Sequence, residues 1–387
     1  MNAGFAQQPS IHRLDGSTLS TGSIDKLVAQ LMDTAHVTGL ELSILNGKTI
    51  TYTKAYGLKN NTTKEPLDTG SVFCAASLSK AAFAFICMLL VQEGKLDLDK
   101  PLYQYIPKPL PVYERYTNLA RDDQWKLLTA RMCLSHTTGF PNWRFLNVKT
   151  GDYDSSGKLA IYFKPGTRYA YSGEGIALLQ LVIEEIMGRD LEAIAREKLF
   201  VPAGMGRSSY VWQPSFENDF AYGHTQAGEV LGKKKRKRPG AAGSLETTVA
   251  DYARFTEYVL RQKGLNQQWM NEMLKPQVRI HSKQQFPTIT DRTSGDNDAI
   301  QLSYGLGWGL MSTPYGKAFF KEGHDEDGWQ HYCISFPDKG TSMLIMSNSL
   351  NAEKIFKDLL EKIIGDHFTP WRWEQYWPYN YTVTQGN

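Results

Sequence analysis

The sequence predicts an α+β fold: one antiparallel sheet built from N- and C-terminal strands, flanked by helices, with an inserted, mainly helical domain. Residues 40–56 have the pattern of a β-hairpin, residues 304–348 contain four short strand patterns, and helical patterns dominate residues 97–277. Because short strands need shared partners to be stable, the early and late strands are expected to join one sheet. Two independent domains in succession are the alternative.

The first elements are a helix and a hairpin. The segment TGSIDKLVAQLMDTAHVTG, residues 21–39, has Ser23 as a candidate N-cap and apolar residues at helical spacing. Residues 40–45 and 49–56 then read as two strands joined by an Asn46-Gly47 turn. A long apolar helix starting near Ser77 follows.

The remaining elements divide the chain. Helical patterns include WKLLTARMCLSH, SGEGIALLQLVIEEIMG, DLEAIAREKLF and TTVADYARFTEYVLRQ, and the late strand patterns are YGLGWGLM, GKAFFKEG, HYCISFP and TSMLIMSN, followed by the helix AEKIFKDLLEKIIG. We expect a flexible tail at 1–20, a sheet domain from 21–96 and 300–368, a helical insert domain at 97–299 and a C-terminal tail at 369–387.

Composition excludes several classes of protein. Charged residues are 21% and hydrophobic residues 41% of the 387, and the net charge of +3 argues against a nucleic-acid binder. Cys74, Cys87, Cys133 and Cys333 have no metal-binding or disulfide spacing and are expected to be buried hydrophobes. The longest apolar run, residues 81–91, is too short for a transmembrane segment. No cofactor or metal is predicted, and the oligomeric state is left open.

Two short segments bear on location and charge. Residues 4–7, Gly-Phe-Ala-Gln, are typical of the end of a signal peptide whose apolar part is missing, which favours an exported or periplasmic protein over a cytoplasmic one. The run KKKRKR, residues 233–238, is predicted to be a solvated loop. Nuclear targeting and binding to nucleic acid or an anionic surface are its weaker alternatives.

Ser77 and Lys80 stand at the start of the apolar segment VFCAASLSKAAFAFICMLL. In a helix beginning near Ser77, this S-x-x-K spacing puts both side chains on one face and points Ser79 elsewhere. Burial and the positive end of the helix both disfavour the charged form of Lys80. A neutral lysine can take the proton of the Ser77 hydroxyl and create a nucleophile. The other interpretation of Lys80 is a surface lysine with a buried stem.

Tyr171 precedes a second helix start, in FKPGTRYAYSGEGIALLQ. A tyrosine at a loop–helix junction can supply a second proton-transfer group when a cation lowers its pKa. By itself, such a residue is more often a packing tyrosine.

Six segments, taken together, resemble the serine β-lactamase and penicillin-binding protein superfamily, in particular its class C β-lactamase-like and family VIII carboxylesterase-like branch. FCAASLSKAAFAF resembles the nucleophile helix, and LLTARMCLSHTTGFPNW is similar to L-L-x-H-T-S-G-L-P. PGTRYAYSGEGIALLQLVIEEIMG is similar to P-G-T-x-x-x-Y-S-N, FVPAGMGRSS to P-L-G-M-x-x-T and AAGSLETTVADYARF to A-G-G-L-x-S-T-x-x-D-L-A-R-F, and YGLGWGL also fits. The resemblance covers residues 24–364 in order and implies a β-lactamase/transpeptidase-like fold.

By this resemblance Ser77 is the acylated nucleophile, Lys80 its base partner and Tyr171 the proton shuttle. The oxyanion hole would use the Ser77 N–H and a second N–H from the edge strand after His324. One departure is Gly173, which stands where the family's second motif has asparagine.

A second departure concerns the third motif, normally Lys-Thr-Gly or His-x-Gly. We place it at His324, where the glycine two residues on is missing. His324, expected to be mostly neutral at pH 7, is therefore a candidate site residue, His331 is a weaker competitor, and either could be structural. Residues 325–327, Asp-Glu-Asp, are expected to repel a substrate carboxylate, which favours neutral esters over cephalosporins.

The resemblance implies a metal-free serine hydrolase that forms an acyl-enzyme with a small-molecule ester, amide or D-amino-acid peptide. A class C-type β-lactamase and a D-Ala-D-Ala carboxypeptidase are alternatives within that class. An alternative of another class is a penicillin-binding or sensing protein that acylates slowly and turns over little.

Overall fold

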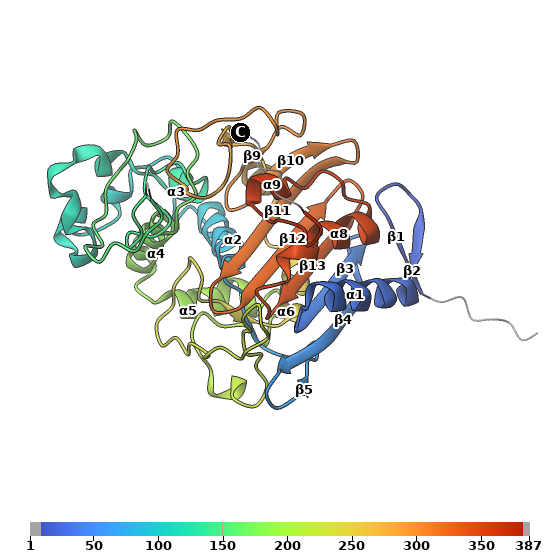
Figure 1. Cartoon of the computed structure of the whole chain (residues 1–387). Coiled ribbons are helices and arrows are strands. Elements are labelled where there is room, and N and C mark those ends of the chain that lie inside the picture. The colour runs from blue at the N-terminus through green and yellow to red at the C-terminus, as the bar shows by residue number, and fades with distance from the viewer. Residues whose placement is uncertain (1–8, 149, 382–387) are drawn as a thin grey trace, which may run out of the picture.

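The computed structural model describes residues 9–148 and 150–381, so the predicted signal-peptide remnant at residues 4–7 lies outside the described residues. Within this part of the chain, nine strands form one antiparallel sheet in the order β5-β4-β3-β13-β12-β11-β10-β9-β8 (Figure 1). Two further pairs, β1 with β2 and β6 with β7, lie outside this sheet. The strands are β1 (Ser10–His12), β2 (Thr18–Ser20), β3 (Gly39–Asn46), β4 (Thr49–Asn60), β5 (Glu65–Pro66), β6 (Phe73–Cys74), β7 (Glu246–Thr247), β8 (Val278–Arg279), β9 (Ser303–Tyr304), β10 (Gly309–Thr313), β11 (Gly316–Asp325), β12 (Trp329–Phe336) and β13 (Thr341–Ser347).

Apart from α9, the helices of the described residues lie in regions where helical patterns were predicted. They are α1 (Thr21–Ala35), α2 (Leu78–Gln92), α3 (Ala130–Leu134), α4 (Gly173–Met187), α5 (Leu191–Ala195), α6 (Val249–Leu260), α7 (Gln267–Met273), α8 (Glu353–Leu359) and α9 (Trp371–Glu374). Short 3-10 helices lie at Leu102–Gln104, Leu110–Val112, Glu114–Arg121, Asp123–Leu127 and Pro214–Phe216, and single π-helical turns extend α5 and α8 at Arg196–Phe200 and Leu360–Ile364.

The pairing of β3 with β13 joins the two ends of the chain. The strands are antiparallel, with Leu45 opposite Ser342 and Leu40 opposite Ser347. β3 also pairs with β4 through the predicted hairpin. The single antiparallel sheet that the sequence predicts is therefore confirmed.

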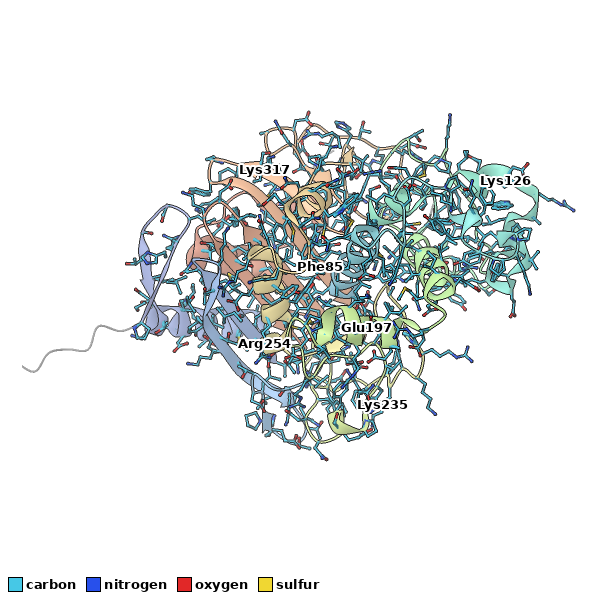
Figure 2. The ribbon with its side chains drawn as sticks, turned by 180° about the vertical axis from the view of Figure 1, so that it is seen from behind. Phe85, Lys126, Glu197, Lys235, Arg254 and Lys317 are labelled. Carbon is cyan, nitrogen blue, oxygen red and sulfur yellow. The ribbon has the colours of Figure 1, made fainter. Side chains whose placement is uncertain are left out.

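Alternation along the central strands produces three layers. Leu40, Leu42 and Ile44 of β3 pack in one core with α1 and α8, whereas Leu344 and Met346 of β13 point into the opposite core with α2 and α6. Figure 1 shows α1 and α8 over one face, and Figure 2, seen from behind, shows α2 over the other. Successive residues of a strand face opposite sides, so both faces of the sheet are covered.

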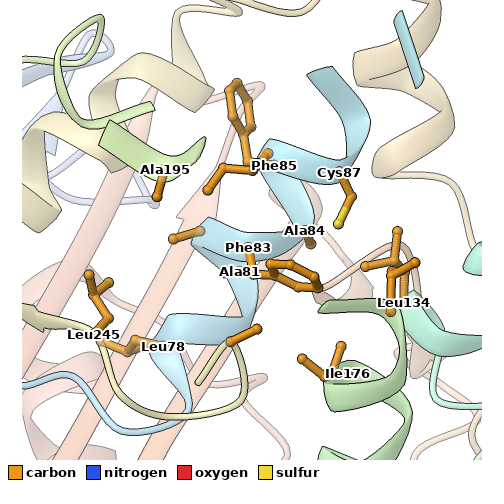
Figure 3. Packing of buried hydrophobic residues seen from close by; sticks show 14 of the residues in the cluster. Leu78, Ala81, Phe83, Ala84, Phe85, Cys87, Leu134, Ile176, Ala195 and Leu245 are labelled. Atoms are coloured by element: carbon orange, nitrogen blue, oxygen red, sulfur yellow. The ribbon is translucent and has the colours of Figure 1, made fainter. Parts of the chain in front are cut away.

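The core helix α2 is apolar on every side. All its residues from Leu78 to Val91 are buried. Figure 3 shows Phe83 and Ala84 lying toward Leu134 and Ile176, with Ala195 on another side of the helix. A helix that is hydrophobic all round must be covered all round, and this packing fixes the position of its N-terminal turn.

Both predicted tails carry structure. Residues 10–20 form the β1–β2 hairpin with Ile11 buried, and α9 buries Trp373 against the α1–α8 core. The predicted flexible tail is therefore wrong for residues 10–20, and the predicted C-terminal tail packs on the fold at residues 371–376. Both segments bring apolar side chains to the same core. The division into a sheet domain and a helical insert domain at residues 97 and 299 stays a proposal. Parts of the proposed insert lie against or within the sheet, because α6 contacts β3, β4 and β13 and β8 is one of its strands.

Two further features are the state of the four cysteines and the length and polarity of the helices. Cys74, Cys87, Cys133 and Cys333 are all buried and unbridged, as predicted. In the described part of the chain, every helix is too short or too polar to cross a lipid bilayer.

Candidate active site

Ser77 is presented by a turn between β6 and α2. Ala76, just before it, has φ of +45°, a left-handed conformation that an L-residue with a Cβ seldom adopts. Ser77 is the N-cap of α2, yet its side chain makes no capping hydrogen bond. A serine at an N-cap normally spends its oxygen on a backbone N–H. Here the hydroxyl stays available for chemistry, and Ser77 is partly exposed.

Lys80 lies against this hydroxyl, one turn into α2. Its Nζ is 2.8 Å from Ser77 Oγ and donates to the carbonyl oxygen of Ala242 over 2.6 Å. The side chain is buried, which excludes the surface-lysine interpretation. Burial, followed by the nearby Lys321 cation, holds the pKa of Lys80 well below its usual range, while Glu322 opposes the shift. These directions favour a neutral amine, which can accept a proton.

Ser79 lies beside Lys80 in sequence but serves the fold. Its hydroxyl donates to the carbonyl oxygen of Ala76 over 2.5 Å and accepts from the N–H of Leu245 over 3.1 Å. It therefore points away from the Ser77–Lys80 pair, as the helical spacing predicts.

Tyr171 reaches the same place from the loop before α4. Its ring centroid is 4.9 Å from Lys80 Nζ and 4.8 Å from Lys321 Nζ. Burial, then Glu322, raises the pKa of Tyr171 well above its usual range, and an interaction with the Ser77 hydroxyl opposes this. The tyrosine is therefore a neutral phenol, a proton donor rather than a standing base.

His136, from the LSHTTG segment, holds the Tyr171–Ser172 junction in place. Its Nδ1 accepts the backbone N–H of Ser172 over 3.1 Å, and its ring lies 4.4 Å from that of Tyr171. Burial, then the Lys321 and Lys80 cations, holds the pKa of His136 well below its usual range. The ring is thus neutral with its proton on Nε2, and it acts on the site by positioning Tyr171.

Lys321 is the site residue that sequence analysis missed. It is fully buried on β11, donates to the phenol oxygen of Tyr171 over 3.0 Å and pairs with Glu322 Oε1 at 2.7 Å. Burial lowers the pKa of Lys321, and the Glu322 carboxylate opposes that shift. Residues 321–323, Lys-Glu-Gly, carry the Lys-x-Gly spacing of the third motif. They are a second candidate for that motif, and our placement of it at His324 stays a prediction.

His324 has a different environment from the one predicted. Its Nδ1 lies 2.7 Å from Glu353 Oε1 and its Nε2 lies 3.4 Å from Glu326 Oε1. Although burial opposes it, the two carboxylates raise the pKa of His324 to about 9, so the ring is a cation at pH 7 and not mostly neutral. No hydrogen bond joins its ring to Ser77 in the described residues. The competitor His331 is fully buried, donates from Nε2 to the carbonyl oxygen of Cys74 over 2.8 Å, and has its pKa lowered to about 4 by burial.

Steric crowding explains why residue 173 is a glycine. A Cβ at this position would lie 2.7 Å from the backbone oxygen of Asn142 and 2.9 Å from its Oδ1. Asn142 Oδ1 also accepts the N–H of Gly173 over 2.9 Å. The asparagine expected at residue 173 has no room, because the loop carrying Asn142 fills that space.

One edge of β11 faces the nucleophile. From Lys321 onward, β11 pairs with β12 alone, because its pairing with β10 ends at Phe320. A Cβ on Gly323 would lie 2.9 Å from Ala75 O, so this edge passes directly beside the turn that presents Ser77. The Ser77 N–H donates to nothing in the described residues. The arrangement offers backbone N–H groups from two elements to one developing oxyanion.

Two cavities open at Ser77. The larger, about 520 Å³, also contacts Tyr171, Trp143 and Phe286. The smaller, about 250 Å³, contacts Lys80, Arg236 and Arg238. The expectation of a solvated loop at residues 233–238 is therefore wrong for Arg236, which is half-buried, whereas Arg238 is exposed and borders the same cavity.

Comparison with known proteins gives a consistent result. The sequence profile of the family described as Beta-lactamase matches residues 24–364. Penicillin-binding protein 4* of Bacillus subtilis (strain 168) is 23% identical over 330 residues, 78% of this chain and 66% of that protein. A beta-lactamase of Pseudomonas fluorescens is 25% identical over 247 residues, 60% of this chain and 63% of that protein. The chain thus spans a little under two thirds of both relatives.

The solved structures agree on the fold. The D-alanine carboxypeptidase AmpC from Burkholderia cenocepacia matches with a TM-score of 0.68 at 17% identity, covering 88% of this chain and 97% of that one. At this identity the likeness shows the shared architecture and nothing about the substrate.

Proposed function

The chain belongs to the beta-lactamase family, and we propose that it is a serine hydrolase in which Ser77 is the nucleophile and Lys80 and Tyr171 move the protons of an acyl-enzyme reaction. The observation that carries this proposal is the 2.8 Å contact between Lys80 Nζ and Ser77 Oγ, made by a buried lysine whose pKa is depressed.

Acylation begins with proton transfer from Ser77 to the neutral amine of Lys80 as Oγ attacks the substrate carbonyl carbon. The carbonyl oxygen becomes an oxyanion, which the Ser77 N–H and a backbone N–H from the free edge of β11 stabilise. Each such donor contributes about 3 kcal/mol to lowering the barrier.

Collapse of the tetrahedral intermediate releases the leaving group. Tyr171, a neutral phenol, donates its proton to the departing oxygen or nitrogen and recovers one from the Lys80 ammonium group. The Lys321 ammonium group, 3.0 Å from the phenol oxygen, stabilises negative charge that develops there during the transfer. Both proton-transfer residues thus return to their starting states.

Deacylation repeats the sequence with water. Lys80 takes a proton from water as its oxygen adds to the acyl carbon, and the resulting ammonium group returns a proton to Ser77 Oγ as the acid leaves. No other co-reactant is required.

The substrates we propose are small esters, amides or D-amino-acid peptides. The larger cavity, with a volume of about 520 Å³, has room for one small acyl or leaving group, and Trp143, Phe286 and Tyr376 give it apolar walls. Relatives named as a penicillin-binding protein and a beta-lactamase support carbonyl substrates of this kind.

The test is covalent labelling. A fluorophosphonate should add once to the wild-type chain, and peptide mapping by mass spectrometry should place the adduct on Ser77 and find none in Ser77→Ala. An adduct on another residue would overturn the proposal. A p-nitrophenyl ester then separates the alternatives: a stoichiometric burst followed by steady turnover supports the hydrolase, and a burst without turnover supports a slowly acylating penicillin-binding protein.

A further inference from the structure

The basic run at residues 233–238 is built into the wall of the candidate active site. Lys233 is buried and pairs with the buried Glu246 at 2.6 Å, and its Nζ lies 4.7 Å from the ring centroid of Trp329. The carbonyl oxygen of Arg236 accepts a hydrogen bond from the backbone N–H of Trp212 over 2.8 Å. An anchored backbone of this kind fixes where the remaining cations of the run point.

Most cations of the run have acidic partners. Lys234 pairs with Asp327 at 2.5 Å, Lys235 with Glu217 at 2.6 Å, and Arg236 with Asp325 at the longer distance of 3.6 Å. These pairs also remove the reason for expecting Asp325 and Asp327 to repel a substrate carboxylate.

Arg238 is the exception at the edge of the site, where its side chain is exposed. Within the described residues it forms no hydrogen bond or ion pair, and it contacts the same 250 Å³ cavity as Ser77 and Lys80. Asp325 is the one acidic residue among the described residues that line this cavity, and it faces Arg236. His324, which also lines the cavity, has its own carboxylate partners. The smaller cavity therefore holds one uncompensated positive charge.

The larger cavity at Ser77 has no such cation. Its lining includes Glu322, Glu326, Glu353 and Glu374 and, among the described residues, no lysine or arginine. Ser77, Trp143 and His324 line both cavities and so mark the boundary between them. Glu322 pairs with Lys321, and Glu326 and Glu353 pair with His324. The larger cavity therefore offers a substrate anion no unpaired cation, and Arg238 gives that anion one favourable direction.

We propose that the smaller cavity is a carboxylate subsite in which Arg238, assisted by Arg236, binds an anionic group carried by the substrate a few bonds from the carbonyl that Ser77 attacks. A guanidinium fork matches a carboxylate with two parallel hydrogen bonds, which gives both affinity and orientation. This inference rests on Ser77 as the nucleophile and adds the substrate class.

The experiment compares substrates that differ in charge alone. The mono-p-nitrophenyl ester of glutarate carries a carboxylate on the acyl side, and its methyl ester is neutral. 4-Acetoxybenzoate carries the carboxylate on the leaving-group side, and its methyl ester is again the neutral partner. In the wild type, kcat/KM for the anionic member of at least one pair should exceed that of its neutral partner by about tenfold, the size expected of one charge-assisted contact.

Variants assign the preference to its source. Arg238→Gln should bring the anionic-to-neutral ratio close to one, and Lys237→Gln should leave it unchanged, because Lys237 is the neighbouring unpaired cation and does not line the cavity. A salt series should weaken the wild-type preference.

The outcomes separate this inference from the proposed function. Labelling of Ser77 and turnover of neutral esters, with no anionic preference in either pair or with a preference that survives Arg238→Gln, would overturn the carboxylate subsite alone. Absence of both labelling and turnover would overturn the nucleophile assignment itself.

Discussion

The ammonium group of Lys321 donates a hydrogen bond to the phenol oxygen of Tyr171 over 3.0 Å, although 150 residues separate them. Lys321 comes from β11 and Tyr171 from the loop before α4, so the contact ties the sheet to the helical region at the site. Through the same charge, Lys321 also lowers the pKa of Lys80.

Replacing Lys321 with methionine should move the acidic limb of the pH–kcat/KM profile to higher pH. The reaction needs neutral Lys80, and removing the neighbouring cation raises the pKa of Lys80. The unpaired Glu322 pushes in the same direction. Lys317→Met, which removes an exposed lysine from the same strand (Figure 2), is the control and should leave the limb in place. An unchanged limb in Lys321→Met would contradict the coupling.

Glu322→Gln should shift that limb the opposite way. Glu322 raises the pKa of Lys80, so its neutralisation lets the amine lose its proton at lower pH. The measurement is the same profile, and opposite displacements in the two variants are the decisive result. Displacements in the same direction would mean that the substitutions act through the fold.

Ser77→Ala and Ser79→Ala should separate chemistry from structure. Ser77→Ala should lower kcat by roughly 10³-fold or more without changing the melting temperature, because Ser77 alone can form the acyl bond. Ser79→Ala removes buried hydrogen bonds to Ala76 and Leu245 and should cost about 1–3 kcal/mol of unfolding free energy while the folded enzyme keeps turning over. Steady-state kinetics and thermal unfolding, measured on the same preparations, test both variants. A stable, active Ser77→Ala together with a stable, inactive Ser79→Ala would contradict these roles.

Lys80→Arg should be nearly as damaging as Lys80→Ala. Arginine keeps a positive charge but has a pKa above about 12 and cannot take a proton from Ser77. Steady-state rates on one neutral ester suffice. Substantial activity in Lys80→Arg would reduce the lysine to an electrostatic role.

The His324–Glu353 pair should make stability depend on pH in one window. The pKa of His324 is about 9 in the folded chain and about 6.5 when unfolded, so its contribution is fully present below pH 6.5 and is lost as pH rises through 9. The melting temperature of the wild type minus that of His324→Gln should therefore shrink between pH 6 and pH 9.5. Glu353→Gln should show the same loss of pH dependence, and a constant difference would contradict the assignment.

Two lysines of the basic run should behave differently. Lys233→Ala leaves Glu246 buried without its partner and should cost about 3–5 kcal/mol. Lys235, which is at the surface in Figure 2, should tolerate alanine without a measurable change in unfolding. Chemical denaturation of the two variants checks this prediction. Equal stabilities would mean that Lys233, like Lys235, belongs to a solvated loop.

Local signals predicted most of the architecture and the three candidate site residues that the structure brings together. The β3–β4 hairpin has its Asn-Gly turn in the sequence, and Ser77, Lys80 and Tyr171 stand at helix starts, which are local patterns. Lys321 lies inside a strand, where a buried lysine looks like any alternating polar residue. Its Lys-x-Gly spacing was the available signal, and the histidine three residues later obscured it.

Long-range pairing could not be predicted in the same way. The partners of the basic run lie on β7, in a separate loop and at the end of β11, so composition alone made the run resemble a solvated loop. The carboxylates around His324 come partly from α8, 29 residues on, and they reverse its expected charge. Burial of residues 10–20 likewise depends on a core made elsewhere in the chain.

The pairing of β3 with β13 also sets the order in which the protein can be completed during synthesis. The ribosome makes α2 early, but the sheet on which α2 rests gains its middle strands only when residues 316–347 have emerged. Until then β3 has an open edge that can pair with other nascent chains. A chain ending at residue 300 should consequently be digested by a protease at concentrations that leave the full chain intact, and equal resistance of the two would show that the first 300 residues fold by themselves.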